Sequence, residues 1–240
     1  MMAQEAFLIE LIGPAGAGKS SLLCELRRQH PALPIFADRL RVREPQNLPF
    51  YLQSGAATLP TLLRPLWTLS GPERWYTREE ISRMLYLVGM HRVFQRRLRR
   101  QGVVVIDQGP IFELTHLRAF GPARLHSHAF VPWWRNLYRQ WAHLYQLVVW
   151  LDAPDEVLIP RVRRRDQAHV IKNYSEADAQ ALLARYRHTF VSVMEQLQHH
   201  ATIPILQFTT NQMAVEEIAQ RILQKLEQIT YVDRFEKNAQ

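Results

Sequence analysis

The amino-acid sequence predicts an α/β fold, in which a central and mostly parallel sheet carries helices on both faces. Two apolar segments, residues 103–107 and 147–152, are rich in valine, and each ends in an aspartate. Runs of this kind are typical of strands that are buried on both sides. Segments with helical periodicity precede the first run and follow the second. Strands that alternate with helices favour a parallel, doubly wound sheet.

Five strands are expected along the chain. Residues 7–12 form the first, since this apolar run stops at Gly13. The second is expected over 40–44, because Pro45 pushes the residue before it out of the helical region. The remaining strands are expected at 103–107, 147–152 and 203–208.

Helices are expected between these strands and after the last one. Lys19 opens a helix of about three turns, which closes at His30 before Pro31. A longer helix begins at Thr77, where Glu80 stands three residues on as a capping box, and it ends at Gly102. Further helical patterns cover 155–165, 176–199 and 213–228.

The chain is expected to form a single domain over residues 1–230, with a frayed tail at 231–240. Residues 46–76 are rich in proline and show no clean period. They and residues 111–141 are predicted to be irregular insertions into the domain. The second of these segments contains Trp133, Trp134 and Trp141, which are expected to pack into the core.

Composition excludes several classes of protein. Of the 240 residues, 47% are hydrophobic and 22% are charged, which is too apolar for a disordered chain. No apolar run approaches the ~18 residues that cross a bilayer, and no basic leader opens the chain. The single cysteine, Cys24, excludes a disulfide framework and predicts a cytoplasmic protein. The net charge of +8 favours anionic partners such as nucleotides, phosphates or nucleic acid.

Residues 13–20 read Gly-Pro-Ala-Gly-Ala-Gly-Lys-Ser and satisfy the GxxxxGK[ST] pattern of a phosphate-binding loop. They lie between the first strand and the first helix, as that loop requires. Glycines let backbone amides approach a phosphate, and the helix N-terminus adds partial positive charge. Lys19 is expected to reach the β- and γ-phosphates, and Ser20 to bind Mg²⁺. The predicted nucleotide contacts are Gly13, Ala15, Gly16, Ala17, Gly18, Lys19, Ser20 and Ser21. A glycine-rich turn without a ligand is the alternative.

Two aspartates end predicted central strands. Asp107 is expected at the edge of the sheet that faces the phosphates, where its carboxylate would hold magnesium or accept a proton from an acceptor hydroxyl. A helix cap or turn is the alternative role. Asp152 has the same placement, but the sequence after it, Ala-Pro-Asp-Glu, favours a cap that opens the next helix.

Arg161 and Arg165 are four residues apart on a predicted helix and would therefore share a face. Two guanidinium groups on one face can hold a phosphoryl group during its transfer. A solvated basic face is the competing interpretation, because the chain is rich in arginine.

With these residues placed, the chain resembles P-loop kinases of the thymidylate kinase and deoxynucleoside kinase branch. Arg43-Glu44-Pro45 is similar to their Arg-Glu-Pro, and Asp107 to the aspartate of their strand-end Asp-Arg pair, although Gln108 replaces the arginine. The stretch from Leu151-Asp152 through Glu156 to Arg161 and Arg165 is similar to the Leu-Asp, glutamate and spaced arginines that lead to the lid in these kinases. The similarity covers residues 4–45, 80–110 and 145–225, including Tyr186 and the stretch 209–222.

The resemblance implies a P-loop NTPase three-layer sandwich with a five-stranded sheet. It also implies ATP and Mg²⁺ as donor and transfer of a phosphoryl group to a small-molecule acceptor. Lys19, Asp107, Arg161 and Arg165 would act in catalysis, and Glu44 would be a base or an acceptor contact. Ser20 and Asp107 would hold the metal. The rival hypothesis is a nucleotide-binding regulator with slow hydrolysis that binds nucleic acid or a protein. A nucleic-acid partner is less favoured, no membrane partner is expected, and a homodimer is left open.

Overall fold

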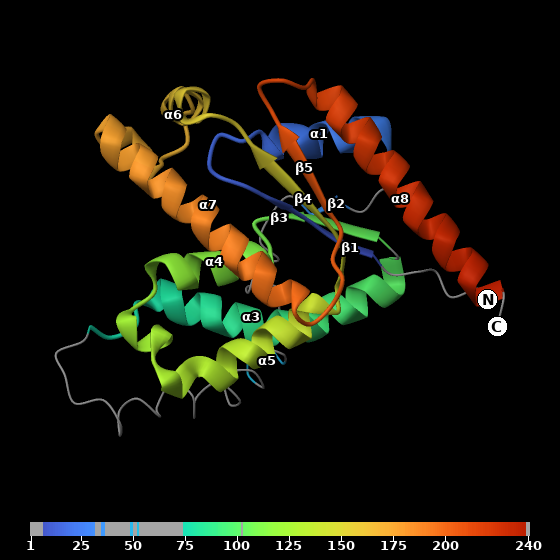
Figure 1. The fold of residues 1–240 in the computed structure, drawn as a ribbon, viewed down its shortest axis with the longest axis horizontal. Coiled ribbons are helices and arrows are strands. Elements are labelled where there is room, and N and C mark those ends of the chain that lie inside the picture. Colours follow the sequence, from blue (N-terminus) through green and yellow to red (C-terminus); the bar gives the residue numbers. More distant parts are fainter. Residues whose placement is uncertain are drawn as a thin grey trace.

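The structure is a computed structural model, and it describes residues 7–31, 35–36, 49, 52, 74–101 and 103–238 of the chain. A five-stranded parallel sheet in the order β2-β3-β1-β4-β5 forms its centre (Figure 1). The strands are β1 (Phe7–Ile12), β2 (Ile35–Phe36), β3 (Val103–Asp107), β4 (Tyr145–Asp152) and β5 (Ile205–Thr209). The helices are α1 (Lys19–Gln29), α3 (Arg78–Gln101), α4 (Pro110–Phe120), α5 (Val131–Ala142), α6 (Asp155–Arg163), α7 (Glu176–Gln198) and α8 (Val215–Asn238). Three short 3₁₀ helices are η2 (Ala123–His126), η3 (His128–Phe130) and η4 (Val170–Asn173).

Strand β1 lies in the middle of the sheet. It pairs with β3 on one side and with β4 on the other, so that Leu11 lies opposite both Asp107 and Val149. Because all the strands are parallel, the segments that follow β1, β3 and β4 leave the sheet at the same edge. That edge is where ligands bind in sheets of this kind.

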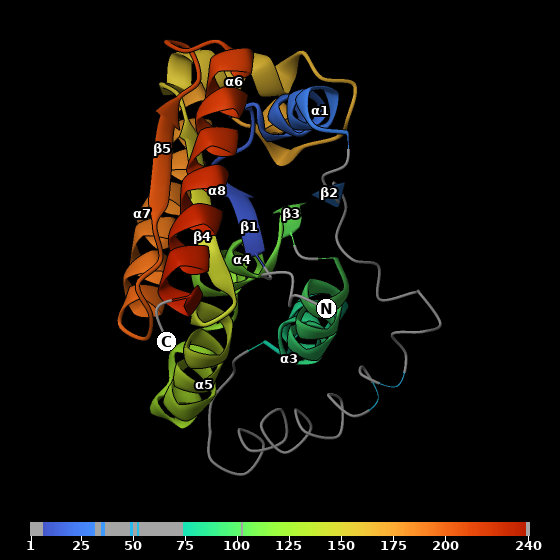
Figure 2. The same cartoon turned by 90° about the vertical axis from the view of Figure 1, so that its right-hand side faces the viewer.

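Helices cover both faces of the sheet and make three layers. Successive side chains of a strand point to opposite faces. On β1, Leu8 and Ile12 pack among residues of α3, α4, α5 and α7, whereas Ile9 and Leu11 pack among residues of α1, α6 and α8. Figures 1 and 2 show these two groups of helices on opposite sides of the strands. Residues buried on both faces explain why the strands read as continuous apolar runs.

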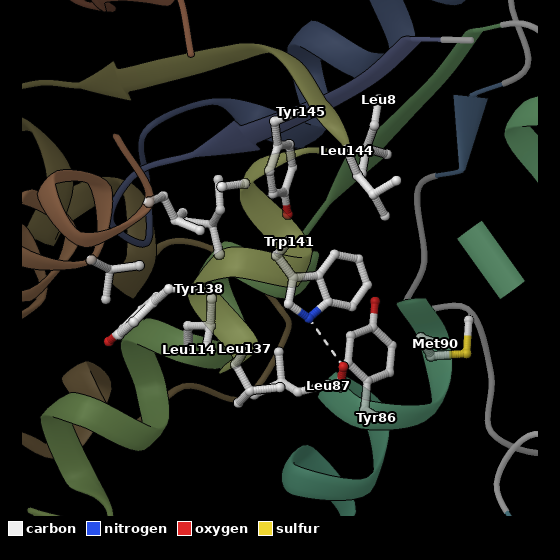
Figure 3. Close-up of a cluster of buried hydrophobic side chains, with 14 of the residues drawn as sticks. Leu8, Tyr86, Leu87, Met90, Leu114, Leu137, Tyr138, Trp141, Leu144 and Tyr145 are labelled. Carbon is white, nitrogen blue, oxygen red and sulfur yellow. Dashed lines mark hydrogen bonds between the residues drawn. The ribbon is translucent and has the colours of Figure 1, made fainter. Parts of the chain in front are cut away.

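Trp141 on α5 stands at the centre of the larger core. Its side chain is fully buried, and its indole Nε1–H donates to the carbonyl oxygen of Leu87 on α3 at 3.0 Å (Figure 3). The ring of Phe94 meets it edge-on, with centroids 5.7 Å apart. These contacts join α5 to α3. Trp134 is buried as well and Trp133 is half-buried, which confirms the predicted core role of the tryptophans.

Residues 111–141 were expected to be irregular, and this expectation is wrong. They form α4, two 3₁₀ helices and α5. The helical period is hidden in α4 because the helix is covered on most sides, with Glu113, Leu114, Thr115 and Leu117 all buried. A helix that is buried all round has no polar stripe to mark its period.

The other expectations are confirmed in large part. The strands at 7–12, 103–107 and 147–152 form as predicted, and the capping box is present, since Thr77 N–H donates to Glu80 Oε2 at 2.7 Å and Glu80 N–H to Thr77 Oγ1 at 3.2 Å. The strand expected at 40–44 lies outside the described residues. So does most of the insertion expected at 46–76, of which only residues 49, 52 and 74–76 are described. Helix α8 continues to Asn238, beyond the predicted end at 228 and through most of the tail expected to fray. The single-domain assignment stays a prediction.

None of the helices in the described ranges combines the length and apolar character that crossing a bilayer requires.

Candidate active site

The loop after β1 has a backbone that only glycine accommodates. Gly13, Gly16 and Gly18 have φ of +135°, +87° and +88°, a region that other residues rarely adopt. A Cβ on Gly13 would lie 1.9 Å from the carbonyl oxygen of Leu151, and one on Gly16 would lie 2.8 Å from that of Leu158. The loop therefore packs against the end of β4 and against α6, while Gly18 caps the N-terminus of α1.

Lys19, the first residue of α1, folds back over this loop. Its Nζ donates to the carbonyl oxygens of Gly13 at 2.9 Å and Pro14 at 3.0 Å. Burial lowers the pKa of the ammonium, and the nearby carboxylate of Asp107 opposes that shift. The charge thus lies beside backbone amides and a helix N-terminus, which together form a site for an anion.

Asp107 ends β3 with its carboxyl group almost covered, at 7% exposure. Burial raises the pKa of this carboxyl group, and Lys19, the backbone N–H of Gln108 and Arg165 counteract the rise. Within the described residues its buried Oδ1 atom has no hydrogen-bond partner. The next residue, Gln108, has φ of +54°, which is unusual for a residue other than glycine and is common at functional sites.

A cavity of about 260 Å³ joins these groups. One part of its wall is the phosphate-binding loop with Lys19 and Ser20, and Asp107 and Gln108 lie in the same wall. Phe112 and Tyr186, whose rings stack with centroids 6.4 Å apart, supply an aromatic part. The remaining lining residues are Val162, Arg165, Gln167, Ala168 and His169. Sequence reasoning missed Phe112 and His169, which belong to no motif, and gave Gln108 no role in the site.

A second cavity shares Gly16, Gly18 and Arg165 with the first. It is lined by Gly16, Ala17, Gly18 and Ser21, by Arg161, Arg164 and Arg165, and by the apolar side chains of Leu22, Leu151, Met213, Val215 and Ile218 together with Thr210. Arg161 closes one side, because Nη1 donates to Thr210 Oγ1 at 3.0 Å and Nη2 donates to the Thr210 carbonyl oxygen at 3.3 Å. All eight residues predicted as nucleotide contacts therefore line one or both cavities.

The two arginines predicted to share a helix face are placed differently. Helix α6 ends at Arg163, so Arg165 follows the helix and the spacing argument fails for it. Arg165 lines both cavities, whereas Arg161 lines the second cavity alone. Glu44, the remaining predicted catalytic residue, lies outside the described residues.

Asp152 does not cap α6 as predicted. The residue at the N-cap position is Pro154, which makes no side-chain cap. The carboxylate of Asp152 instead pairs with Arg187 of α7, with Oδ2 2.8 Å from Nε and Oδ1 3.1 Å from Nη2. The arginine lies 35 residues away along the chain, so no local pattern could have shown this partner.

A second buried carboxylate, Glu10 of β1, holds the segment that follows Asp107. Its oxygens accept the N–H groups of Ile111 and Phe112 in the first turn of α4, each at 3.0 Å, and the hydroxyl of Tyr145 donates to Oε2. Burial raises the pKa of Glu10 to about 7. Sequence analysis gave Glu10 no role, because its partners come from distant elements.

The donor set fits a hard divalent cation. Ser20 offers a hydroxyl oxygen and Asp107 a carboxylate whose buried Oδ1 atom lacks a partner in the described structure, and oxygen ligands of this kind suit Mg²⁺. Among the described residues, no group of three or more His, Cys, Asp or Glu side chains could hold a metal ion. A metal here would accordingly share its coordination with substrate phosphates.

The family model described as AAA domain matches residues 8–191, well over half of the chain. The chain belongs to the AAA domain family. No curated protein sequence is similar enough to this AAA domain to count as a match.

Solved structures similar to this AAA domain include two kinases. Deoxyadenosine kinase from M. mycoides, with the products dCMP and dCDP, has 14% sequence identity and a TM-score of 0.54, and the match covers 92% of this chain and 100% of that one. Thymidylate kinase from Candida albicans also has 14% identity, with a TM-score of 0.49 and coverage of 95% and 93%. The likeness to deoxyadenosine kinase shows the fold, and with it the predicted P-loop kinase architecture is confirmed.

Proposed function

We propose that this AAA domain transfers the γ-phosphoryl group of ATP, with Mg²⁺, to a small-molecule acceptor. One observation carries the proposal: the cavity that holds the phosphate-binding loop and Asp107 is also lined by Phe112 and Tyr186. A nucleotide-binding regulator needs the loop alone. An aromatic wall beyond a strand-end carboxylate is what a second, organic substrate requires.

The loop side of the site is suited to the donor nucleotide. Backbone amides of the loop and the N-terminus of α1 would hold the phosphates, with Lys19 exchanging its carbonyl contacts for phosphate oxygens. The second cavity, apolar and bordered by Arg161, would take the base. Ser20 and Asp107 would hold Mg²⁺, which when bound neutralises charge on the transferring group.

Two groups in the first cavity are suited to the transfer itself. Arg165 would stabilise charge on the phosphoryl group as it moves. The carboxylate of Asp107 would either complete the metal site or accept the proton of the attacking hydroxyl, and its raised pKa favours proton acceptance. The resemblance to thymidylate kinases offers Glu44 as an alternative base. The fold shared with deoxyadenosine kinase supports phosphoryl transfer as the reaction type.

The test is a screen with ATP that carries oxygen-18 in its γ-phosphoryl group. The protein is incubated with labelled ATP, Mg²⁺ and a cell-derived metabolite pool, and the products are analysed by mass spectrometry. We expect an organic phosphate that carries the label, and no such product with Lys19→Ala. Label recovered in inorganic phosphate alone would favour the slow hydrolase and overturn the kinase.

A further inference from the structure

His169 lies in the segment that joins α6 to α7, and neither the motifs nor the proposed mechanism uses it. Its half-buried side chain lines the same cavity as Lys19, Ser20 and Asp107. Arg165, at the start of the same segment, lines the cavity too. The segment therefore presents two nitrogen donors to the place where the phosphates would lie.

The local structure holds this segment in position. Ile171, two residues after His169, is completely buried in the core beside α6 and α1. The ammonium of Lys172 donates to the carbonyl oxygen of Arg165 and so closes the segment into a loop. His169 and Arg165 are thus held on one short, anchored stretch of backbone, which reduces the entropy lost when they bind a ligand.

One hydrogen bond fixes the tautomer of the His169 ring. The imidazole caps η4, because the backbone N–H of Ile171 donates to its Nδ1 atom at 3.3 Å. A nitrogen that accepts a hydrogen bond carries no proton, so in the neutral ring the proton is on Nε2. The ring therefore has an N–H donor, Nε2–H, on the side opposite the Nδ1 atom that caps η4.

The charges around the ring agree with a neutral donor. Burial lowers the pKa of His169, and the cations Arg165 and Lys19 lower it further. Without an anion in the cavity the ring is uncharged at neutral pH and adds no repulsion beside the two cations. An arriving polyphosphate would accept the Nε2–H of the neutral ring, while Nδ1 keeps its hydrogen bond from the N–H of Ile171.

We infer that His169 is a phosphate ligand of the donor nucleotide, presenting Nε2–H to a phosphate oxygen while its Nδ1 stays bound to the N–H of Ile171. This inference rests on the proposed function, since it assigns a contact to the triphosphate in the first cavity. The proposed ligand is a polyphosphate anion, and this contact does not involve the acceptor substrate.

Two substitutions distinguish the loss of the Nε2–H donor from the loss of the Nδ1 acceptor that caps η4. In His169→Asn, Oδ1 stands close to the former Nδ1 position and can still accept from Ile171, but the Nε2 donor is lost. In His169→Gln, the side-chain amide reaches the Nε2 position and restores a donor. By calorimetric titration with Mg-ATP we expect Asn to weaken binding about tenfold to a hundredfold, the range for a hydrogen bond to a charged group. We expect Gln to recover most of that loss.

The matched control is His126→Asn, which changes an exposed histidine that lines neither cavity. It should bind Mg-ATP as the wild type does. Wild-type affinity in His169→Asn would overturn the inference and leave the proposed function intact. Equal losses in the Asn and Gln variants would overturn it as well, because they would assign the effect to packing. If the wild type bound no purine triphosphate, the proposed function would fail together with the inference.

A spectroscopic measurement tests the tautomer directly. A long-range ¹H–¹⁵N spectrum of the nucleotide-free protein should show His169 protonated at Nε2 and unprotonated at Nδ1, with the signals assigned by their absence in His169→Asn. Addition of Mg-ATP should shift the Nε2 resonance. The opposite tautomer, or an Nε2 signal that Mg-ATP leaves in place while the nucleotide binds, would contradict the inference.

Discussion

Arg187 of α7 forms a two-point contact with Asp152 at the end of β4, with Nε and Nη2 both donating to the carboxylate. The same guanidinium donates to the Ala153 carbonyl oxygen and lies 2.7 Å from Asp155 Oδ1 in the first turn of α6. One side chain thus joins the sheet, α7 and the start of the helix that leads to Arg165.

Replacement of Arg187 by lysine should loosen that junction. Lysine keeps the charge but cannot form the forked contact. We expect a loss of about 1–2 kcal/mol in the free energy of unfolding, measured by urea denaturation. The control is Arg221→Lys, in an exposed pair with Glu217 on α8, which should cost less than ~0.5 kcal/mol. Equal effects at the two positions would show that the junction contributes no more than a surface pair.

Asp107→Asn should make the protein more stable and less active. The raised pKa of Asp107 means that folding favours its protonated form, so this group's stabilisation is complete below the unfolded-state pKa and is lost as pH rises through the higher folded-state value. Asparagine removes the buried charge, so the melting temperature at neutral pH should rise. Turnover should fall by ~10²-fold or more. Unchanged turnover at saturating Mg²⁺ would reduce Asp107 to a turn residue.

Arg161 and Arg165 should respond differently to replacement by lysine. Arg165 lines the cavity of the phosphates, so Arg165→Lys should lower kcat and kcat/KM together, by about tenfold or more. Arg161 lines the second cavity and binds Thr210, so Arg161→Lys should mainly raise the KM for ATP. Steady-state kinetics with the acceptor found in the screen distinguish the two. The same loss of kcat in both variants would return them to the shared role first predicted from their spacing.

Glu10 should give the stability a specific pH dependence. Its pKa rises from 4.5 to about 7 on folding, so the protonated form stabilises the native state below pH 4.5, and that stabilisation is lost as the pH rises through 7. A shift of this size corresponds to roughly 3 kcal/mol. Glu10→Gln removes this titration, so the difference in unfolding free energy between variant and wild type should grow in favour of the variant from pH 4.5 to 7.5. A constant difference would show that Glu10 does not titrate in this range.

The parts of the fold that the sequence predicts are those that depend on local signals. Strands buried on both faces read as apolar runs, and the phosphate-binding loop requires glycines at fixed positions for backbone reasons, as Gly13 against Leu151 shows. The capping box of α3 is likewise complete within Thr77 and Glu80. Each of these features can be recognised without knowing what the segment packs against.

The features that sequence analysis missed depend on partners far along the chain. The first turn of α4 is bound by Glu10, a residue about one hundred positions earlier. Asp152 pairs with Arg187, 35 residues away, and the segment that carries His169 is held in the core by the buried Ile171. Tertiary contacts of this kind leave no periodicity and no motif, which is why the second cavity and the placement of Arg165 became visible only in the structure.

The central claim is that the loop around Lys19 binds the phosphates of a Mg-nucleotide, and calorimetric titration with Mg-ATP tests it most directly. Lys19 contacts two carbonyl oxygens and lies outside both hydrophobic clusters, so Lys19→Ala should leave the thermal melt nearly unchanged. Removal of a charged phosphate contact should weaken binding about a hundredfold or more. We predict a clear binding isotherm for the wild type and its near loss in the variant. A wild-type protein that binds no purine triphosphate, or a variant that binds Mg-ATP equally well, would contradict the account.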